Sequence, residues 1–267
     1  MKNTSNKKIF IVGNKFHEFS IHENVKTFGE ILEIIRTNSF ANLPSNSQLV
    51  SGQGLTEVQA QALYDQGLYP LAAHGIDISP LLQRPLRVSR LQSHKHYIRN
   101  AIISHPKRLD EHNFESHLIL DERSELMNDH QTGQHIQGMV LIEAARQMFL
   151  AVTEEYFIGD NWTEPYYFVL NSLAANFTGF VFPLDVVFNY RINSSDISRL
   201  SRLHFDITIS VNQGDTSAAT LSFQFTAYHA EKLKKNEHKQ AIKFLNKQTG
   251  RDSISRKAEN LENVYLA

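Results

Sequence analysis

Apolar residues occupy every helical face of the segment that follows Gly138. Met139-Val140-Leu141-Ile142 and Ala144-Ala145 are interrupted only by the acid Glu143. An amphipathic surface helix confines its apolar side chains to one stripe, so this pattern predicts a helix buried on nearly all sides, from about His135 to Phe157. An ionised carboxylate in such a helix is costly unless it is paired or kept protonated, so Glu143 needs a physical reason.

Period-two alternation of apolar and polar residues dominates the sequence after this helix. It is clearest between 203 and 212, and Gln213-Gly214-Asp215 joins that run to the next one. Runs at 96–104, 113–120, 167–182, 185–193, 203–212 and 220–230 all predict strands. Two or three strands, a buried helix and three or four long antiparallel strands describe an α+β fold in which a sheet wraps around a central helix, the hotdog architecture.

The chain divides into three parts. Residues 1–88 predict a small N-terminal α/β unit, with two short strands around Gly13-Asn14 and a helix over 27–36. A second helix of this unit starts after the N-cap Thr56 and ends near Gly67. Residues 89–230 make up the hotdog domain, and residues 231–267 form a basic C-terminal tail whose helix ends near Gly250.

The composition narrows the classes of function. Because the chain of 267 residues has no cysteine, it has neither disulfides nor thiolate nucleophiles nor Cys-ligated zinc. The net charge of -1 gives no global attraction to nucleic acid, and the sequence contains neither a membrane-spanning apolar run nor a secretory signal. We therefore expect a cytoplasmic protein without a membrane or nucleic-acid partner. The histidines near the buried helix lack metal-binding spacing, so we expect no metal and no cofactor.

Three motifs together resemble a known family. The segment HIQGMVLIEAARQMF, with Ser93-His94-Lys95 ahead of the first strand and Asp129-His130 ahead of the helix, is similar to the A-factor biosynthesis hotdog family. The resemblance covers roughly residues 90–230. It implies transfer of a β-ketoacyl group from a carrier-protein thioester to the hydroxyl of dihydroxyacetone phosphate. The wider hotdog class also includes thioesterases and β-hydroxyacyl dehydratases. The dehydratases carry Gly followed five residues later by Glu on the same helix, as Gly138 and Glu143 are here.

Eight residues are candidates for the site, and most of them have an alternative structural interpretation. Glu143 is a candidate general acid or base whose pKa burial would raise; alternatively it forms an ion pair with Arg146. His130 and His135 precede the helix, where unpaired N–H groups can polarise a thioester carbonyl; alternatively they lie on the surface or cap the helix. The catalytic candidates are Glu143, His130, His135, Arg146 and Gln147, and the substrate-binding candidates are Gly138, His94 and Asp129.

The remaining alternatives for single residues concern Asp129 and His94. Asp129 either orients His130 or is an acid that stabilises the start of the helix. His94 is expected on a strand, where it either contacts substrate or is a satisfied strand histidine.

Two classes of function follow from these residues. In the first, the protein is an acyl-thioester enzyme that accepts an acyl carrier protein or coenzyme A thioester, with acyl transfer ranked before dehydration and hydrolysis. In the second, it is a non-catalytic protein that binds an acyl group or lactone, or acts as a scaffold. A Glu143 that is paired away from any cavity favours the second class. A single hotdog domain also exposes a sheet edge, so we expect a homodimer, and the basic tail is a candidate docking site for an acidic carrier protein.

Overall fold

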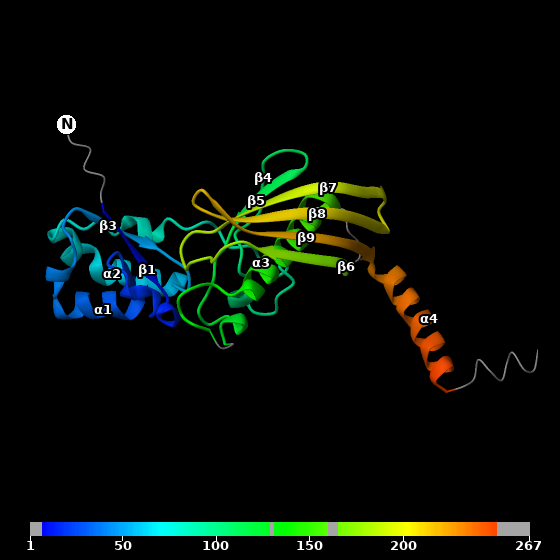
Figure 1. Ribbon diagram of the computed structural model, residues 1–267, viewed down its shortest axis with the longest axis horizontal. Helices are drawn as coiled ribbons and strands as arrows, with labels where there is room; N and C mark the ends of the chain where they lie inside the picture. The colour runs from blue at the N-terminus through cyan, green and yellow to red at the C-terminus, as the bar shows by residue number, and fades with distance from the viewer. Residues whose placement is uncertain (1–6, 129–130, 160–164, 250–267) are drawn as a thin grey trace, which may run out of the picture.

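The computed structural model describes residues 7–128, 131–159 and 165–249. Two units lie side by side along the long axis, and a helix projects from the far end of the second unit (Figure 1). The first unit contains a three-stranded sheet and the second a six-stranded sheet. Within the described residues, no helix combines the length and the hydropathy needed to span a bilayer.

The first unit is a parallel sheet with two helices. Strand β1 (Lys7–Val12) lies between β2 (Val25–Thr27) and β3 (Ser47–Ser51). Helices α1 (Phe28–Thr37) and α2 (Glu57–Ala73) each begin with a capping box, in which a threonine accepts a hydrogen bond from the third helical residue and that residue bonds back. The predicted N-cap Thr56 is therefore confirmed.

Two local predictions for this unit are wrong. A second strand was expected directly after Gly13-Asn14, but that segment forms two short 3-10 turns, Asn14–Phe16 and Phe19–Ile21. Helix α2 does not end at Gly67 but continues through it to Ala73. A Cβ at this glycine would lie within 3.0 Å of side chains from α2, α1 and the following loop, so Gly67 serves close packing instead of ending the helix.

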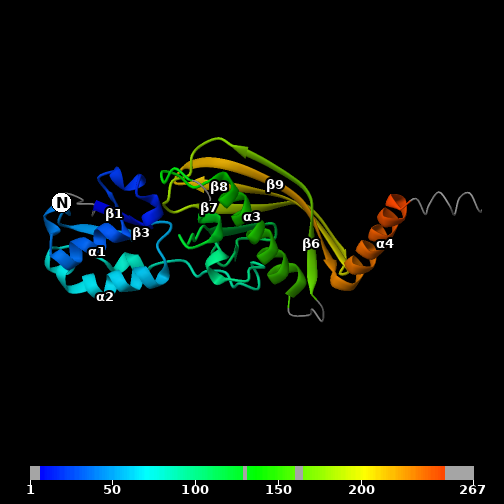
Figure 2. The same cartoon turned by 90° about the horizontal axis from the view of Figure 1, so that it is seen from below.

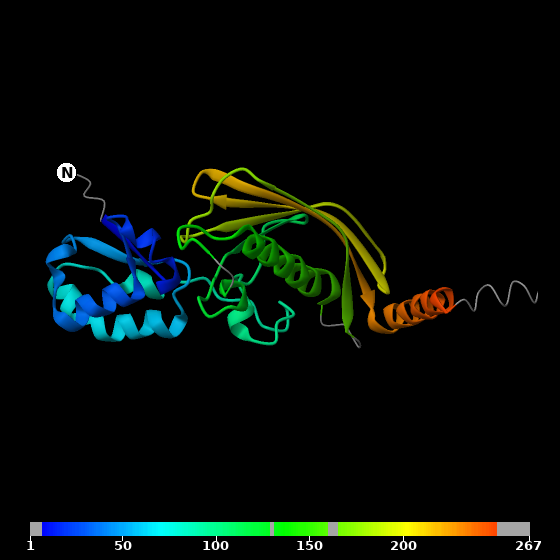
Figure 3. The same ribbon diagram turned by 60° about the horizontal axis from the view of Figure 1, so that its bottom comes forward.

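The second unit has the expected hotdog arrangement. Its sheet has the strand order β4-β5-β7-β8-β9-β6, and all neighbours are antiparallel. Helix α3 (Gly138–Thr153) lies against the concave face of the curved sheet and continues as a π-helical turn, Glu154–Ile158 (Figure 3). The strands are β4 (Lys107–Arg108), β5 (Asn113–His117), β6 (Tyr166–Phe177), β7 (Val187–Arg199), β8 (Arg202–Gln213) and β9 (Thr216–His229).

Aromatic packing fills the space between α3 and this sheet. The ring of Phe149 on α3 stacks on that of Phe225 on β9, with centroids 4.3 Å apart, and Phe225 in turn stacks on Phe205 of β8. These side chains are almost completely buried. Because every turn of α3 contributes to this core, the helix is held firmly relative to the sheet.

The predicted strand over residues 96–104 is absent. The segment contains a 3-10 turn, Ile98–Asn100, followed by single bridges from Ile103 and Ser104. The side-chain amide of Gln147 on α3 replaces a neighbouring strand: it accepts from the backbone N–H of Ile102 at 2.9 Å and donates to the carbonyl of Asn100 at 2.9 Å. A buried backbone needs such partners, and here a helix supplies them.

A second glutamine joins the two units. Gln53 follows β3, and its amide donates to the carbonyls of Leu118 and Leu184 and accepts from the N–H of Leu120. The carboxyl ends of β1 and β3 therefore abut the hotdog domain, as the view in Figure 2 also shows. Helix α4 (Ala230–Gln248) leaves the opposite end of the molecule after β9.

Candidate functional site

Glu143 is the centre of a network of charges on α3. One carboxylate oxygen, Oε1, lies 2.7 Å from Lys95 Nζ and accepts from Arg146 Nη2 and Gln147 Nε2, each at 3.0 Å. The other, Oε2, accepts from Arg146 Nε at 2.8 Å. A carboxylate with this many donors is fully satisfied although it is largely buried.

The protonation state of Glu143 follows from these contacts. Burial alone would raise the pKa of its carboxyl, but hydrogen bonds and charge from Arg146, with further hydrogen bonds from Lys95 and Gln147, outweigh burial and hold the pKa below the ordinary value. The expectation of a raised pKa is therefore wrong. An ionised Glu143 fixes two cationic side chains in place, as its alternative interpretation as an ion pair anticipated.

His94 stands in a strained turn instead of on a strand. The backbone N–H of Lys95 donates to Arg90 and that of His94 to Leu91, which is the pattern of a Schellman motif. His94 has a φ of 54° at the position of this motif that glycine usually occupies. The chain thus keeps a large polar side chain at a backbone conformation that glycine would adopt with less strain energy.

The imidazole of His94 reaches the end of α3. Its Nε2 lies 2.5 Å from Oε1 of Glu154, and its ring packs edge-on against Phe168 of β6. Because the carboxylate of Glu154 accepts a hydrogen bond from Nε2–H, Nδ1 is the ring nitrogen that can accept a proton. Consecutive residues therefore contact two carboxylates along this helix: Lys95 contacts Glu143 of α3, and His94 contacts Glu154 in the π-helical turn that continues it.

A pocket of about 680 Å³ opens beside this turn. His94 and Glu154 line it together, Lys95 and Arg90 add positive charge, and Tyr166 adds an aromatic wall. Glu143 does not line it. The pocket has the size of a small-ligand site and contains a paired imidazole and fixed cations.

The residues expected before the helix lie at its other end. His135 contacts the hydroxyl of Thr132 and the ring of Phe180, and the ring of Phe177 lies 3.0 Å from where a Cβ on Gly138 would stand. Since α3 rises by about 1.5 Å per residue, Gly138 and Glu154 are about 24 Å apart. One substrate atom cannot contact both. Asp129 and His130 lie outside the described residues.

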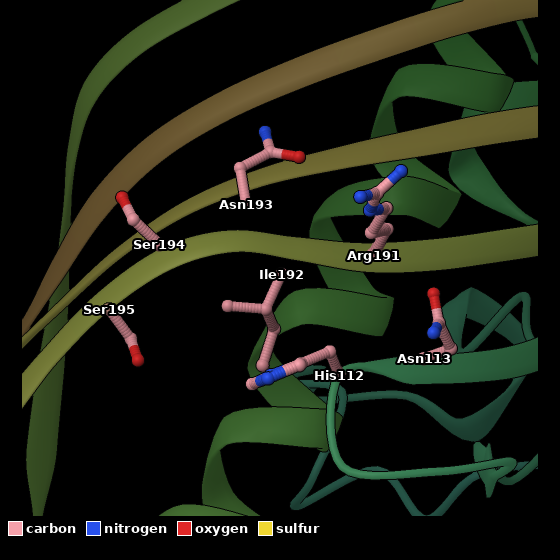
Figure 4. A pocket seen from close by; sticks show the side chains of 7 residues that line it. All are labelled: His112, Asn113, Arg191, Ile192, Asn193, Ser194 and Ser195. Atoms are coloured by element: carbon pink, nitrogen blue, oxygen red, sulfur yellow. The ribbon is translucent and has the colours of Figure 1, made fainter.

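A second hollow, of about 350 Å³, lies where β5 begins beside β7 (Figure 4). The exposed side chains of Arg191 and Asn193 line it, whereas Ile192 between them is buried. No carboxylate lines this hollow, and His112 is the only titratable group there besides Arg191. We assign no chemistry to it. The described part of the chain also contains no group of three His, Asp or Glu side chains that could hold a metal ion.

Sequence reasoning did not single out Lys95 and Glu154 as site residues. A signal for Glu154 was present, because it follows Glu143 by three helical turns and therefore shares its face of α3. Lys95 belongs to the Ser93-His94-Lys95 motif but was given no role of its own. The turn at His94 brings both side chains against α3 and the π-helical turn that continues it.

Comparison with known proteins identifies the domain. Residues 76–229 match the A-factor biosynthesis hotdog domain, and a search of curated proteins found no match. Among solved structures, a conserved protein from Pseudomonas aeruginosa is 18% identical with a TM-score of 0.38, covering 52% of this chain and 99% of its own. A thioesterase from Haemophilus influenzae is 14% identical (TM-score 0.35, 52% and 87%).

A further solved structure is a hypothetical thioesterase protein from Streptococcus pneumoniae with coenzyme A, which is 11% identical (TM-score 0.36, 53% of this chain and 98% of its own). These three likenesses are weak, and the assignment of the chain rests on the domain match. That match includes the whole six-stranded sheet, α3 and the turn that carries His94. The chain belongs to the A-factor biosynthesis hotdog family.

Proposed function

We propose that this protein acts on acyl thioesters, and that it transfers a β-ketoacyl group from an acyl carrier protein or coenzyme A to the hydroxyl of a small acceptor. The observation that carries the proposal is the His94–Glu154 pair in the wall of the 680 Å³ pocket. A base oriented by a carboxylate, beside a cavity, is the arrangement that activates a hydroxyl nucleophile.

The proposed mechanism follows from the two ring nitrogens of His94. Nε2–H donates to Glu154, so Nδ1 accepts the proton of the acceptor hydroxyl as its oxygen attacks the thioester carbonyl. Glu154 stabilises the imidazolium that forms. When the tetrahedral intermediate collapses, the carbon–sulfur bond breaks and the imidazolium returns the proton to the departing thiolate. Lys95 and Arg90 supply positive charge for an anionic acceptor such as dihydroxyacetone phosphate.

Dehydration and hydrolysis rank below transfer in this proposal. A hotdog dehydratase would use the carboxyl five residues after Gly138 for proton transfer. Here that residue is Glu143, which is ionised and already accepts from three side chains. Hydrolysis needs only water in place of the acceptor hydroxyl, so the same pocket supports it if no acceptor is bound.

The proposal includes a homodimer formed through β6. Among the described strands, this strand of 12 residues pairs with β9 alone and forms one edge of the sheet. It exposes apolar side chains that a partner would cover, namely Tyr167, Leu170, Leu173 and Phe177. Antiparallel pairing of two β6 edges would satisfy both backbones. Leu173→Lys should convert the dimer to a monomer in light scattering, and a monomeric wild type would reject this assembly.

The reaction is tested by intact-protein mass spectrometry of a carrier protein that bears a β-ketoacyl group. The carrier is incubated with the protein, with and without dihydroxyacetone phosphate. Loss of the acyl group only with the acceptor indicates transfer, loss without it indicates hydrolysis, and loss of one water from the β-hydroxyacyl form indicates dehydration. His94→Asn, which tolerates the left-handed backbone, should slow transfer roughly 10²- to 10⁴-fold.

The chain provides a matched control for His94. His105 forms the same kind of pair with Glu155, the next residue along the π-helical turn, at 3.0 Å, but it does not line the pocket. His105→Asn should leave the rate of transfer unchanged. Equal rates for wild type and His94→Asn would reject His94 as the base.

A non-catalytic binding protein is the second candidate, and one observation favours it. Glu143 is paired and does not contribute to the pocket wall, so the most unusual acid of α3 has a structural explanation. In that case the loaded carrier stays chemically unchanged with every acceptor, while wild type and His94→Asn bind it equally well.

A further inference from the structure

Helix α4 carries a face of lysines that the rest of the described chain leaves uncovered. Lys235, Lys239 and Lys243 follow one another at intervals of four, and Lys232 and Lys247 extend the same face by one turn each way. Only Lys235 has an ionic partner, Glu231, among the described residues, and Lys232 donates to the hydroxyl of Ser201. Five lysines along one side of a helix form a linear positive surface.

Ile242 borders this lysine face and is 45% exposed, whereas Phe244 and Leu245, which are 61% and 58% exposed, lie farther round the helix. The helix contacts the body near its base, mainly through β6 and β9, and points away from both units (Figures 1 and 2). Nothing in the core therefore requires this combination of apolar and cationic side chains, which is typical of a surface that meets a partner.

The base of α4 adjoins the pocket beside His94. The backbone N–H of Ala230, the first residue of α4, donates to the carbonyl of Pro165 at 3.0 Å, and Pro165 lines the pocket. The ring of Tyr166, another lining residue, packs edge-on against His229, the N-cap of α4. A partner lying along α4 would therefore have one end beside the pocket.

From this continuity we propose that the lysine face of α4 docks an acidic carrier protein and delivers its thioester arm to the adjoining pocket; the inference rests on the proposed acyl-thioester function. The lysines supply charge complementarity, and the neighbouring Ile242 supplies apolar contact area. A nucleic acid would find only Phe244 to stack on. An anionic lipid surface would also attract the lysines. Lipid binding, however, would not explain why a pocket with a cationic wall lies at the base of the helix.

Charge reversal on α4 tests the docking. The variant K239E/K243E/K247E should weaken binding of acyl carrier protein at least roughly tenfold in a titration by fluorescence anisotropy. Wild-type binding should weaken as salt is added, because the contact is ionic and exposed. The control K7E/K8E/K107E changes the net charge equally at exposed positions on β1 and β4, away from α4, and should bind like wild type. Circular dichroism checks that α4 stays helical in both variants.

A small thioester separates docking from catalysis. Wild type and K239E/K243E/K247E should process a β-ketoacyl pantetheine thioester at equal rates. With the carrier-bound thioester, the variant should be slower than wild type. Equal carrier affinity in wild type and the α4 variant overturns the docking. So does loss of affinity in the control variant to the same degree, which would indicate general charge attraction.

Two further outcomes separate the docking from a lipid-binding role and from the enzymatic function. Binding of wild type to phosphatidylserine vesicles but not to the carrier overturns the proposal in favour of a lipid surface. If neither thioester is processed but the carrier still binds through α4, the docking stands and the enzymatic function fails.

Discussion

The ammonium group of Lys95 lies 2.7 Å from a carboxylate oxygen of Glu143, and this contact ties a surface turn to the most buried helix of the protein. The same carboxylate holds Arg146 through two hydrogen bonds. Two cations share one acid, so the group carries a net positive charge beside the pocket. This arrangement explains an acid inside an apolar helix without requiring the acid to move a proton.

Removal of that acid should destabilise the fold. Glu143→Gln leaves Lys95 and Arg146 without a compensating charge in a partly buried place, and we expect a loss of about 2 kcal/mol in the free energy of unfolding near neutral pH. The pKa of Glu143 is lowered in the folded state, so its contribution is present above the ordinary value of 4.5 and is lost as pH falls through the folded pKa. Urea denaturation at several pH values measures both effects.

An exposed ion pair provides the comparison for Glu143. Glu18 lies 3.0 Å from His17, and both side chains are at least half exposed. Glu18→Gln should change stability by less than about 1 kcal/mol. An equally small change for Glu143→Gln would contradict the structural role assigned to the Glu143 network.

Backbone strain at His94 should be measurable apart from its chemistry. His94→Ala keeps an unfavourable left-handed residue and removes the imidazole, whereas His94→Gly removes both the imidazole and the strain. We expect His94→Gly to be more stable than His94→Ala by about 1 kcal/mol in urea denaturation. Both should be inactive if His94 is the base. Equal stability of the two variants would show that the turn is not strained.

The order of elements in the hotdog domain was predictable because periodicity reports burial directly. The alternation through β8 and the all-apolar run of α3 both follow from which faces meet the core. The segment 96–104 was not predictable, because its apolar residues are also compatible with a strand. Its hydrogen bonds come from Gln147, which is far away in the sequence.

The site was predictable only in part, for a similar reason. The motifs indicated Glu143, Arg146 and His94, and the structure places all three on or against α3. It also separates His94 from His135 and Gly138 by the length of a helix, which no motif spacing encodes. The contact between His94 and Glu154 depends on a left-handed turn that favours glycine, so local propensity gave no indication of it.

Gln147 should contribute to stability whether or not it contributes to chemistry. It is completely buried, and its amide serves the backbone at Asn100 and Ile102 as well as Glu143. Gln147→Leu leaves these buried groups without partners, so we expect a loss of about 2–4 kcal/mol in the free energy of unfolding. Hydrogen exchange of the Ile102 amide should accelerate. If Gln147→Leu did not change the stability, the structural role of Gln147 would be rejected and a role in the reaction would be favoured.

The pair His117–Asp185 should make stability depend on pH. His117 Nδ1 lies 3.0 Å from Asp185 Oδ1; the hydrogen bond that the imidazolium donates to this carboxylate raises the pKa of His117 and lowers the pKa of Asp185. The contribution of His117 is complete below its ordinary value of 6.5 and is lost as pH rises through the folded pKa. That of Asp185 is present above its ordinary value of 3.8 and is lost as pH falls through the folded pKa.

The pair therefore stabilises the fold most between these two ordinary values. Because the side chain of Asp185 is 72% exposed, solvent screens the interaction and the gain should stay below about 1 kcal/mol. Asp185→Asn should lower the free energy of unfolding at about pH 5, and its difference from wild type should shrink toward about pH 8 as the charge on His117 is lost. Urea denaturation of wild type and Asp185→Asn at about pH 5 and about pH 8 measures the contribution of the pair. That contribution is the change in the stability difference between the two proteins from one pH to the other. The same pH dependence in wild type and Asp185→Asn would mean that other groups govern it.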